Sequence, residues 1–166
     1  MALEIERKFL LNDDWKSQVL PQELNILSVM RIEQTYLALV LDEEIRVRKI
    51  EHESTGERLF FHTYKKGFGL QREEIEFPIS QKLYEQLIEN NGAPQPLLKT
   101  RTRLKWGTTT LEGDEYEQFE LCVVEVEFTD IQEAKQFQAP SWFGKELSDS
   151  QIYSNKHLWK KIQGYG

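Results

Sequence analysis

The chain has 166 residues, of which 39% are hydrophobic and 30% are charged, a composition typical of a globular protein with one core. Its formal net charge of -7 argues against general nucleic-acid binding, which depends on a surplus of lysine and arginine at the surface. We therefore expect a single domain over residues 1–166 with no nucleic-acid partner.

The sequence also argues against a membrane or an exported protein. No stretch approaches the roughly 20 consecutive apolar residues that cross a bilayer. Acids stand at Glu4 and Glu6, where a signal peptide needs a basic and then an apolar run. The one cysteine, Cys122, cannot form an internal disulfide. We expect a cytoplasmic protein without a membrane partner.

Alternation of apolar and polar residues predicts strands along most of the chain. In chain order, the expected strands are 3–9, 28–39, 44–50, 58–66, 71–79, 98–106, 108–112 and 119–128. The fourth and fifth strands form a hairpin around a turn that contains Gly67 and Gly69. The last two are expected to pair through a turn.

Helices are fewer and short. A turn or two is expected at 13–19, and Ser80 is a suitable N-cap for a helix at 81–90. Asp130 starts another helix that ends before Pro140, and the last helix covers about 154–162. Many antiparallel strands with a few peripheral helices predict a mainly β (α+β) fold, built as a closed or nearly closed barrel.

Several strands carry same-sign charges spaced two residues apart on the face that is not apolar. These sets are Glu4/Glu6, Arg46/Arg48, Glu74/Glu76, Lys99/Arg101/Arg103 and Glu125/Glu127. Any one of them is compatible with a solvated face, which is normally polar. Together they fit that interpretation poorly, because like charges side by side repel each other. Facing one another across a barrel interior would neutralise them, with the apolar faces outward beneath the helices.

Such an interior has a specific chemistry. Carboxylates are preferred ligands of Mg²⁺ and Mn²⁺, which proteins commonly bind together with substrate phosphates. Arginine and lysine bind phosphate oxygens. The pattern therefore predicts a site for a metal–polyphosphate complex, where cleavage of a phosphoanhydride needs mainly positioning and charge stabilisation.

Short motifs along the chain resemble those of the CYTH family, also called the triphosphate tunnel metalloenzymes. Residues 4–10 (EIERKFL) resemble its ExExK signature, and the resemblance continues through 34–37 (QTYL), 46–48 (RVR), 63–65 (TYK), 72–76 (REEIE), 99–101 (KTR), 124–127 (VEVE), 142–146 (WFGKE) and 153–156 (YSNK). The last two match the family's short bacterial branch. ExExK alone is weak, but this order and spacing over nearly the whole chain is specific.

The resemblance implies an eight-stranded antiparallel barrel that forms a tunnel, with dependence on Mg²⁺ or Mn²⁺. The implied metal ligands or their close neighbours are Glu4, Glu6, Glu125, Glu127 and Asp114. The implied triphosphate-binding residues are Lys8, Arg46, Arg48, Lys65, Arg72, Lys99 and Arg101. Glu74 and Glu76 would line the tunnel, where they reach a second metal or orient water. Related barrels often pair, so a homodimer is compatible with the resemblance.

One departure from the family pattern concerns the acid in the strand before the last acidic strand. Asp114 takes that place if the following hairpin is two residues shorter, whereas a gapless count back from Glu125 selects Glu112. We favour Asp114, because Tyr116 then takes the family's aromatic position.

Catalytic roles stay open for two residues. Lys8 could contact phosphate, act as a general acid or base, or pair with nearby glutamates; beside an anion it should keep its proton, which favours the phosphate contact. Tyr36 is a candidate partner in proton transfer, although a strand tyrosine also commonly packs with its hydroxyl satisfied. The final helix is expected either to close one tunnel mouth or to present a basic surface.

The favoured function is metal-dependent hydrolysis of inorganic tripolyphosphate by water, with Lys8, Tyr36 and Glu76 as candidate catalytic residues. Adenylate cyclase and thiamine triphosphatase are alternatives within the same family. A non-catalytic polyphosphate- or nucleotide-binding module is the alternative from another class, although such a module would not need every acidic pair.

Overall fold

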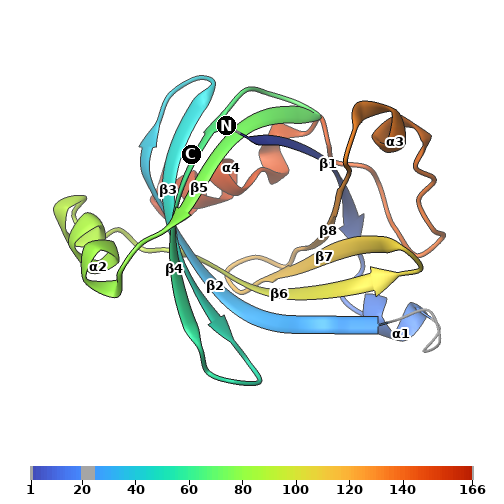
Figure 1. Cartoon of the computed structure of the whole chain (residues 1–166), viewed down its shortest axis with the longest axis horizontal. Helices are drawn as coiled ribbons and strands as arrows, with labels where there is room; N and C mark the ends of the chain where they lie inside the picture. The colour runs from blue at the N-terminus through green and yellow to red at the C-terminus, as the bar shows by residue number, and fades with distance from the viewer. Residues whose placement is uncertain (1, 20–24, 166) are drawn as a thin grey trace.

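The computed structural model describes residues 2–19 and 25–165. Its strands form a closed barrel in the spatial order β1-β5-β4-β3-β2-β6-β7-β8, and every neighbouring pair is antiparallel (Figure 1). The strands are β1 (Ala2–Leu11), β2 (Asn25–Leu39), β3 (Glu43–His52), β4 (Arg58–Lys66), β5 (Gln71–Pro78), β6 (Leu97–Trp106), β7 (Thr109–Tyr116) and β8 (Cys122–Glu127). The predicted eight-stranded antiparallel barrel is confirmed.

The helices lie where the sequence signals place them. They are α1 (Trp15–Gln18), α2 (Gln81–Asn90), α3 (Ile131–Gln136), the 3₁₀ turn η1 (Gln151–Tyr153) and α4 (Asn155–Ile162). Ser80, Asp130 and Ser154 each accept a hydrogen bond from a backbone N–H in the first turn of α2, α3 and α4, which satisfies a donor that the helix itself leaves free. No helix within the described residues is long and apolar enough to span a membrane.

The predicted ends of the last two strands are wrong. β7 continues to Tyr116, and β8 begins only at Cys122. The alternation in β7 is hidden because its outward position after Leu111 is a glycine, Gly113, which has no side chain to show an apolar face. Trp15 fills that space: a Cβ added to Gly113 would lie 3.0 Å from its ring.

The outer faces of the strands are apolar and are largely covered. Ile5, Phe9, Val124 and Val126 belong to a cluster that includes Trp15 of α1 and residues of α3 and the segment after it. Val47 and Phe60 pack against Tyr84 of α2. The predicted arrangement, with apolar faces outward beneath the helices, is thus confirmed for most of the barrel. Apolar side chains remain exposed on β5, where Ile75 and Phe77 are 39% and 44% exposed, and at the start of β1, where Leu3 is 60% exposed.

The interior changes character along the barrel. Its middle is charged, whereas at one end the inward positions are apolar: Leu97, Tyr116 and Val123 form a cluster with Leu158 of α4. Trp159 of α4 also packs edge-on against Tyr36, with ring centroids 5.6 Å apart. Helix α4 therefore packs against one end of the barrel interior, as one of the two sequence alternatives proposed.

Candidate active site

The middle of the barrel contains a cavity of about 180 Å³, which we call the inner cavity. It is lined by seven glutamates, six arginines and lysines, and one asparagine. They are Glu4, Glu6, Glu74, Glu76, Glu112, Glu125, Glu127, Arg46, Arg48, Lys65, Arg72, Lys99, Arg101 and Asn155. The predicted convergence of opposite charges is therefore present, except that Arg103 is exposed and does not line the cavity. No apolar side chain of the described residues lines this cavity.

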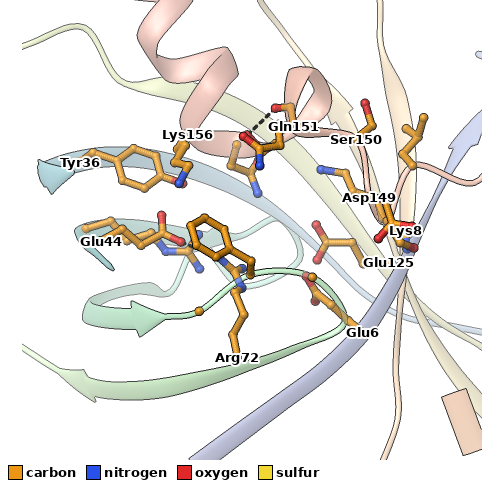
Figure 2. A pocket seen from close by; sticks show the side chains of 18 residues that line it. Glu6, Lys8, Tyr36, Glu44, Arg72, Glu125, Asp149, Ser150, Gln151 and Lys156 are labelled. Atoms are coloured by element: carbon orange, nitrogen blue, oxygen red, sulfur yellow. Dashed lines mark hydrogen bonds and ion pairs between the residues drawn. The ribbon is translucent and has the colours of Figure 1, made fainter. Parts of the chain in front are cut away.

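A second cavity of about 330 Å³, the outer cavity, adjoins the first and shares Glu6, Arg46, Arg72, Glu125 and Asn155 with it. Figure 2 shows its walls, which come from the strands, from the turn 67–69 and from the C-terminal segment 147–156. The turn residues Gly67 and Gly69 have φ of 116° and 75°, a backbone region that favours glycine. The shared lining makes the two cavities one continuous space.

Strand register decides which charges face each other. Glu4 lies opposite Arg72, and Lys65 lies opposite Glu74. The Nζ of Lys65 donates to Glu4 at 2.8 Å, and the Nη2 of Arg72 donates to it at 3.3 Å. Burial alone would raise the pKa of Glu4, but Lys65 and Arg72 outweigh it and hold that pKa well below its usual range. This part of the wall is neutralised by the protein itself.

The acids where β1 meets β8, namely Glu6 and Glu127 with the neighbouring Glu4, are different, and we call them the acidic seam. Strand register places like charges together here. Glu6 lies opposite Glu127, and carboxylate oxygens of Glu4, Glu6 and Glu127 come within 4.8 Å of one another. Burial and then the charges of Glu125 and Glu4 raise the pKa of Glu6 well above its usual value. Burial and then Glu112 raise the pKa of Glu127. Glu6 and Glu127 therefore lack enough positive charge, and their oxygens together with those of Glu4 fit Mg²⁺ or Mn²⁺.

On the opposite wall, formed by β6 and β7, Asp114 forms ion pairs with Lys99 and Arg101. We call these three residues the paired wall. Asp114 is fully buried and accepts hydrogen bonds from Lys99 at 2.9 Å and from Arg101 at 2.8 Å. Burial would raise the pKa of Asp114, but Arg101 and Lys99 hold it well below the usual range. Burial, with Arg101 adding to it and Asp114 opposing it, lowers the pKa of Lys99 to about 8. Asp114 is therefore in a neutralised ion-pair network rather than in the acidic group on β1 and β8.

Both candidates for the family's tunnel acid face inward. Glu112 lines the inner cavity and accepts from the Nη1 of Arg101 at 3.3 Å, while Asp114 lies deeper. Glu125 lies 3.7 Å from the Nη2 of Arg101, between the paired wall and the acidic seam. The preference for Asp114 over Glu112, and the metal-ligand roles of Asp114 and Glu125, stay predictions.

Two arginines on β3 have spare hydrogen-bond donors. Arg46 and Arg48 are both buried, and the Nε atom of each has no hydrogen-bond partner in residues 2–19 and 25–165. Burial, then the neighbouring Arg46 and Arg101 cations, lowers the pKa of Arg48 to about 10. Buried donors without partners are costly, and crowded cations repel one another. An anion in the inner cavity would relieve the repulsion between these cations.

The three candidate catalytic residues are divided between the two cavities. Lys8 and Tyr36 line the outer cavity (Figure 2), and Glu76 lines the inner one. The Nζ of Lys8 donates to the carbonyl oxygen of Tyr153 at 2.8 Å. The hydroxyl of Tyr36 accepts from Gln34 at 3.0 Å, and burial, followed by the charge of Glu44, raises its pKa. The phenol therefore keeps its proton.

Glu76 is held as a carboxylate. It accepts from the hydroxyl of Thr63 at 2.7 Å and from the Nη2 of Arg48 at 3.1 Å. Burial would raise the pKa of Glu76, but Arg48 and the Thr63 hydroxyl outweigh it and lower that pKa. Glu76 can therefore accept hydrogen bonds from a ligand or from water.

Sequence reasoning assigned no role to several residues that line the site, among them Glu44 and Asn155, although Asn155 lies within the 153–156 motif. Glu44 is buried, lines the outer cavity and accepts from Arg72 at 2.7 Å. Its position two residues before Arg46 was a usable signal, since it continues the inward face of that strand. Asn155 lines both cavities but lies on α4, where the alternation of strands carries no information.

Comparison with known proteins gives a consistent result. A family model described as CYTH domain matches residues 2–158. An inorganic triphosphatase of Nitrosomonas europaea is 31% identical over 163 residues, covering 93% of this chain and 95% of the relative. An inorganic triphosphatase of Acetivibrio thermocellus is 26% identical, covering 96% and 95%. A crystal structure of an inorganic triphosphatase superimposes with a TM-score of 0.59 at 28% identity, with 95% of each chain covered.

Proposed function

The chain belongs to the CYTH domain family, and on this premise we propose that it hydrolyses a triphosphate inside the barrel, with inorganic tripolyphosphate as the favoured substrate. The observation that carries the proposal is the inner cavity, which brings six arginines and lysines together with the converging carboxylates of Glu4, Glu6 and Glu127. Two relatives that match nearly the whole chain are inorganic triphosphatases, which supports the choice of substrate.

The charge balance of the inner cavity favours a metal. Its seven glutamates and six cations give a lining of net charge about -1 when all are ionised, and a triphosphate adds several more negative charges. Glu4, Glu6 and Glu127 are the residues that would hold Mg²⁺ or Mn²⁺. When bound, the ion would neutralise these acids, offset phosphate charge and favour attack by water.

The cations supply the binding surface for phosphate. Arg46 and Arg48 line the inner cavity, and Lys65, Arg72, Lys99 and Arg101 add positive charge around the same space. Lys8 lies nearer the outer cavity, where it can contact one end of the substrate. Because these side chains are held by strand register and ion pairs, little reorganisation is needed when substrate binds.

The chain's own residues divide the remaining tasks. Glu76, kept ionised by Arg48 and Thr63, can accept a hydrogen bond from the attacking water and so orient it. Tyr36 keeps its proton and can donate a hydrogen bond to a phosphate oxygen of the leaving group. Lys8 is assigned to phosphate contact, since it lines the outer cavity next to the space for the substrate.

A second candidate substrate is an organic triphosphate such as ATP or thiamine triphosphate. The outer cavity is larger than the inner one, and the 52% exposed ring of Phe68 lies in its wall. An organic group joined to the triphosphate could occupy that space and stack on the ring.

The test is release of phosphate from tripolyphosphate, ATP and thiamine triphosphate, each measured with Mg²⁺, with Mn²⁺ and with a chelator. We expect the highest kcat/KM for tripolyphosphate and no turnover in chelator. Release of a cyclic nucleotide from ATP would identify a cyclase instead. Absence of turnover with every substrate and metal, together with tight binding, would identify a non-catalytic binding module.

A further inference from the structure

Asn155 differs from every other residue of the inner cavity. Among the described residues that line this cavity, it is the one side chain without a formal charge, and it is the one contributed by a helix rather than a strand. It also lines the outer cavity, so it stands where the two spaces join. Neither the charge pattern nor the roles assigned above account for an amide at this position.

Its hydrogen bonds decide which way the amide points. The hydroxyl of Tyr116 donates to the Oδ1 of Asn155 at 2.5 Å, and the Nζ of Lys99 donates to the same atom at 3.4 Å. Lysine has donors but no acceptor, so the Asn155 atom that faces Lys99 must be the oxygen. The Nδ2 group therefore lies on the other side of the amide.

That Nδ2 group is available to a ligand. It donates no hydrogen bond to any residue in 2–19 or 25–165, and it is not among the buried atoms that lack a partner. Since Asn155 lines both cavities, the free donor is accessible from the space where the two cavities meet.

The backbone beneath Asn155 is firmly held. It is the first residue of α4, and the hydroxyl of the preceding Ser154 accepts from the N–H of His157 at 3.2 Å. One turn later, Leu158 packs in the apolar cluster at the end of the barrel. The amide is thus positioned before any ligand arrives, which lowers the entropy cost of using it.

We propose that Asn155 contacts the triphosphate directly, donating a hydrogen bond from Nδ2 to a phosphate oxygen while its Oδ1 positions Lys99. The inference rests on the proposed function and deepens it. A neutral amide suits both tasks: a cation here would repel Lys99, and a carboxylate would repel the phosphate. Asn155 makes the C-terminal helix part of the substrate site as well as a cover for the barrel.

The test measures binding apart from turnover. Inorganic tripolyphosphate is titrated calorimetrically into the full-length wild-type protein and its variants in chelator, and kcat and KM are measured separately with Mg²⁺. Asn155→Ala removes the donor without adding charge, and we expect its Kd and its KM to rise about tenfold or more, since hydrogen bonds to charged groups are strong. Lys160→Ala, an exposed position on the same helix, is the matched control and should bind as the wild type does.

A second variant separates contact from packing. Asn155→Asp has the same shape and keeps the acceptor for Tyr116 and Lys99, so its melting temperature should stay at or above that of the wild type, while its Kd should rise at least as much as that of Asn155→Ala. Asn155→Asp also adds a negative charge, which salt screens little inside the cavity, so the contribution of the donor is measured with Asn155→Ala. If Asn155 only held the helix in place, a folded Asn155→Ala variant would bind tripolyphosphate as tightly as the wild type does.

The outcomes distinguish this inference from the proposed function. Binding of tripolyphosphate within twofold of the wild type by a folded Asn155→Ala variant would overturn the inference, whatever the turnover. A wild-type protein that binds tripolyphosphate more tightly than Asn155→Ala but never cleaves it would support the contact and overturn the proposed hydrolysis.

Discussion

Two walls of the same cavity show opposite solutions to burying charge. On β6 and β7, register places Arg101 opposite Asp114, and the carboxylate is neutralised by cations on its own protein. On β1, β7 and β8, register places Glu6 opposite Glu127 and Glu112 opposite Glu125, so acids face acids. Like charges directly opposite each other destabilise a sheet. The first wall is complete as it stands, whereas the second leaves Glu6 and Glu127 with raised pKa values, because too little positive charge lies beside them.

The largest expected effect is on stability, at the paired wall. Asp114→Ala would leave Lys99 and Arg101 buried beside each other without their shared partner. Breaking a buried ion pair in this way costs about 3–5 kcal/mol, and we expect that loss in the free energy of unfolding measured by urea denaturation. Glu112→Gln, which removes a more peripheral partner of Arg101, is the control and should cost far less. Equal losses in the two variants would mean that Asp114 does not anchor this wall.

The next effect is on activity, at the acidic seam. Glu6→Gln removes one of three converging carboxylates, and turnover with Mg²⁺ should fall about a hundredfold or more. Because burial and nearby acids disfavour a charged Glu6, the melting temperature without metal should not fall. Glu73→Gln, an exposed position on β5, is the matched control. Full activity in Glu6→Gln would remove this residue from the ligand set.

Metal binding should also appear as a gain in stability that depends on the seam. A ligand that binds only the folded protein at one hundred times its Kd adds about 2.7 kcal/mol. We therefore expect saturating Mg²⁺ or Mn²⁺ to raise the melting temperature of the wild type and to raise that of Glu6→Gln much less. An equal rise in both proteins would place the stabilising ion elsewhere.

The sequence predicted the barrel and its charged interior because both depend on alternation, which is local. Glu4, Arg46, Lys99 and Glu127 could each be assigned to one face of a strand from their neighbours alone. Which of them meet is set by register between distant strands, and this is why the pairing of Asp114 with Lys99 and Arg101 did not follow from the sequence.

Alternation along a strand could not predict the contacts that this strand makes with residues of other elements. Gly113 interrupted the apolar face of β7 because Trp15, far away in the sequence, fills its place. Asn155 lines the inner cavity but lies on helix α4. The residues next to it in the sequence do not show that it lies near the inward faces of β6 and β7. Contacts of this kind require the three-dimensional arrangement.

The smallest effect on stability is expected at the ion pair between Arg7 and Glu146, which lies on the outside of the barrel. Comparing this exposed pair with the buried network around Asp114 shows how much burial changes the contribution of an ion pair. Arg7 donates to Glu146 at 2.7 Å, and this hydrogen bond lowers the pKa of Glu146 below its usual value of 4.5. Glu146 is 39% exposed, so solvent screening limits the pair to about 1 kcal/mol or less. Arg7 also keeps its bonds to the carbonyl oxygens of Ala134 and Phe137 when Glu146 is changed.

The sign of its pH dependence follows from that lowered pKa. The folded protein holds the Glu146 proton less tightly than the unfolded chain, so the stabilisation is present above about pH 4.5 and is lost as the pH falls through the lower folded value. Glu146→Gln should therefore melt slightly below the wild type at neutral pH and at the same temperature in acid. A loss at neutral pH as large as that of Asp114→Ala would contradict the comparison, because an exposed pair would then matter as much as a buried network.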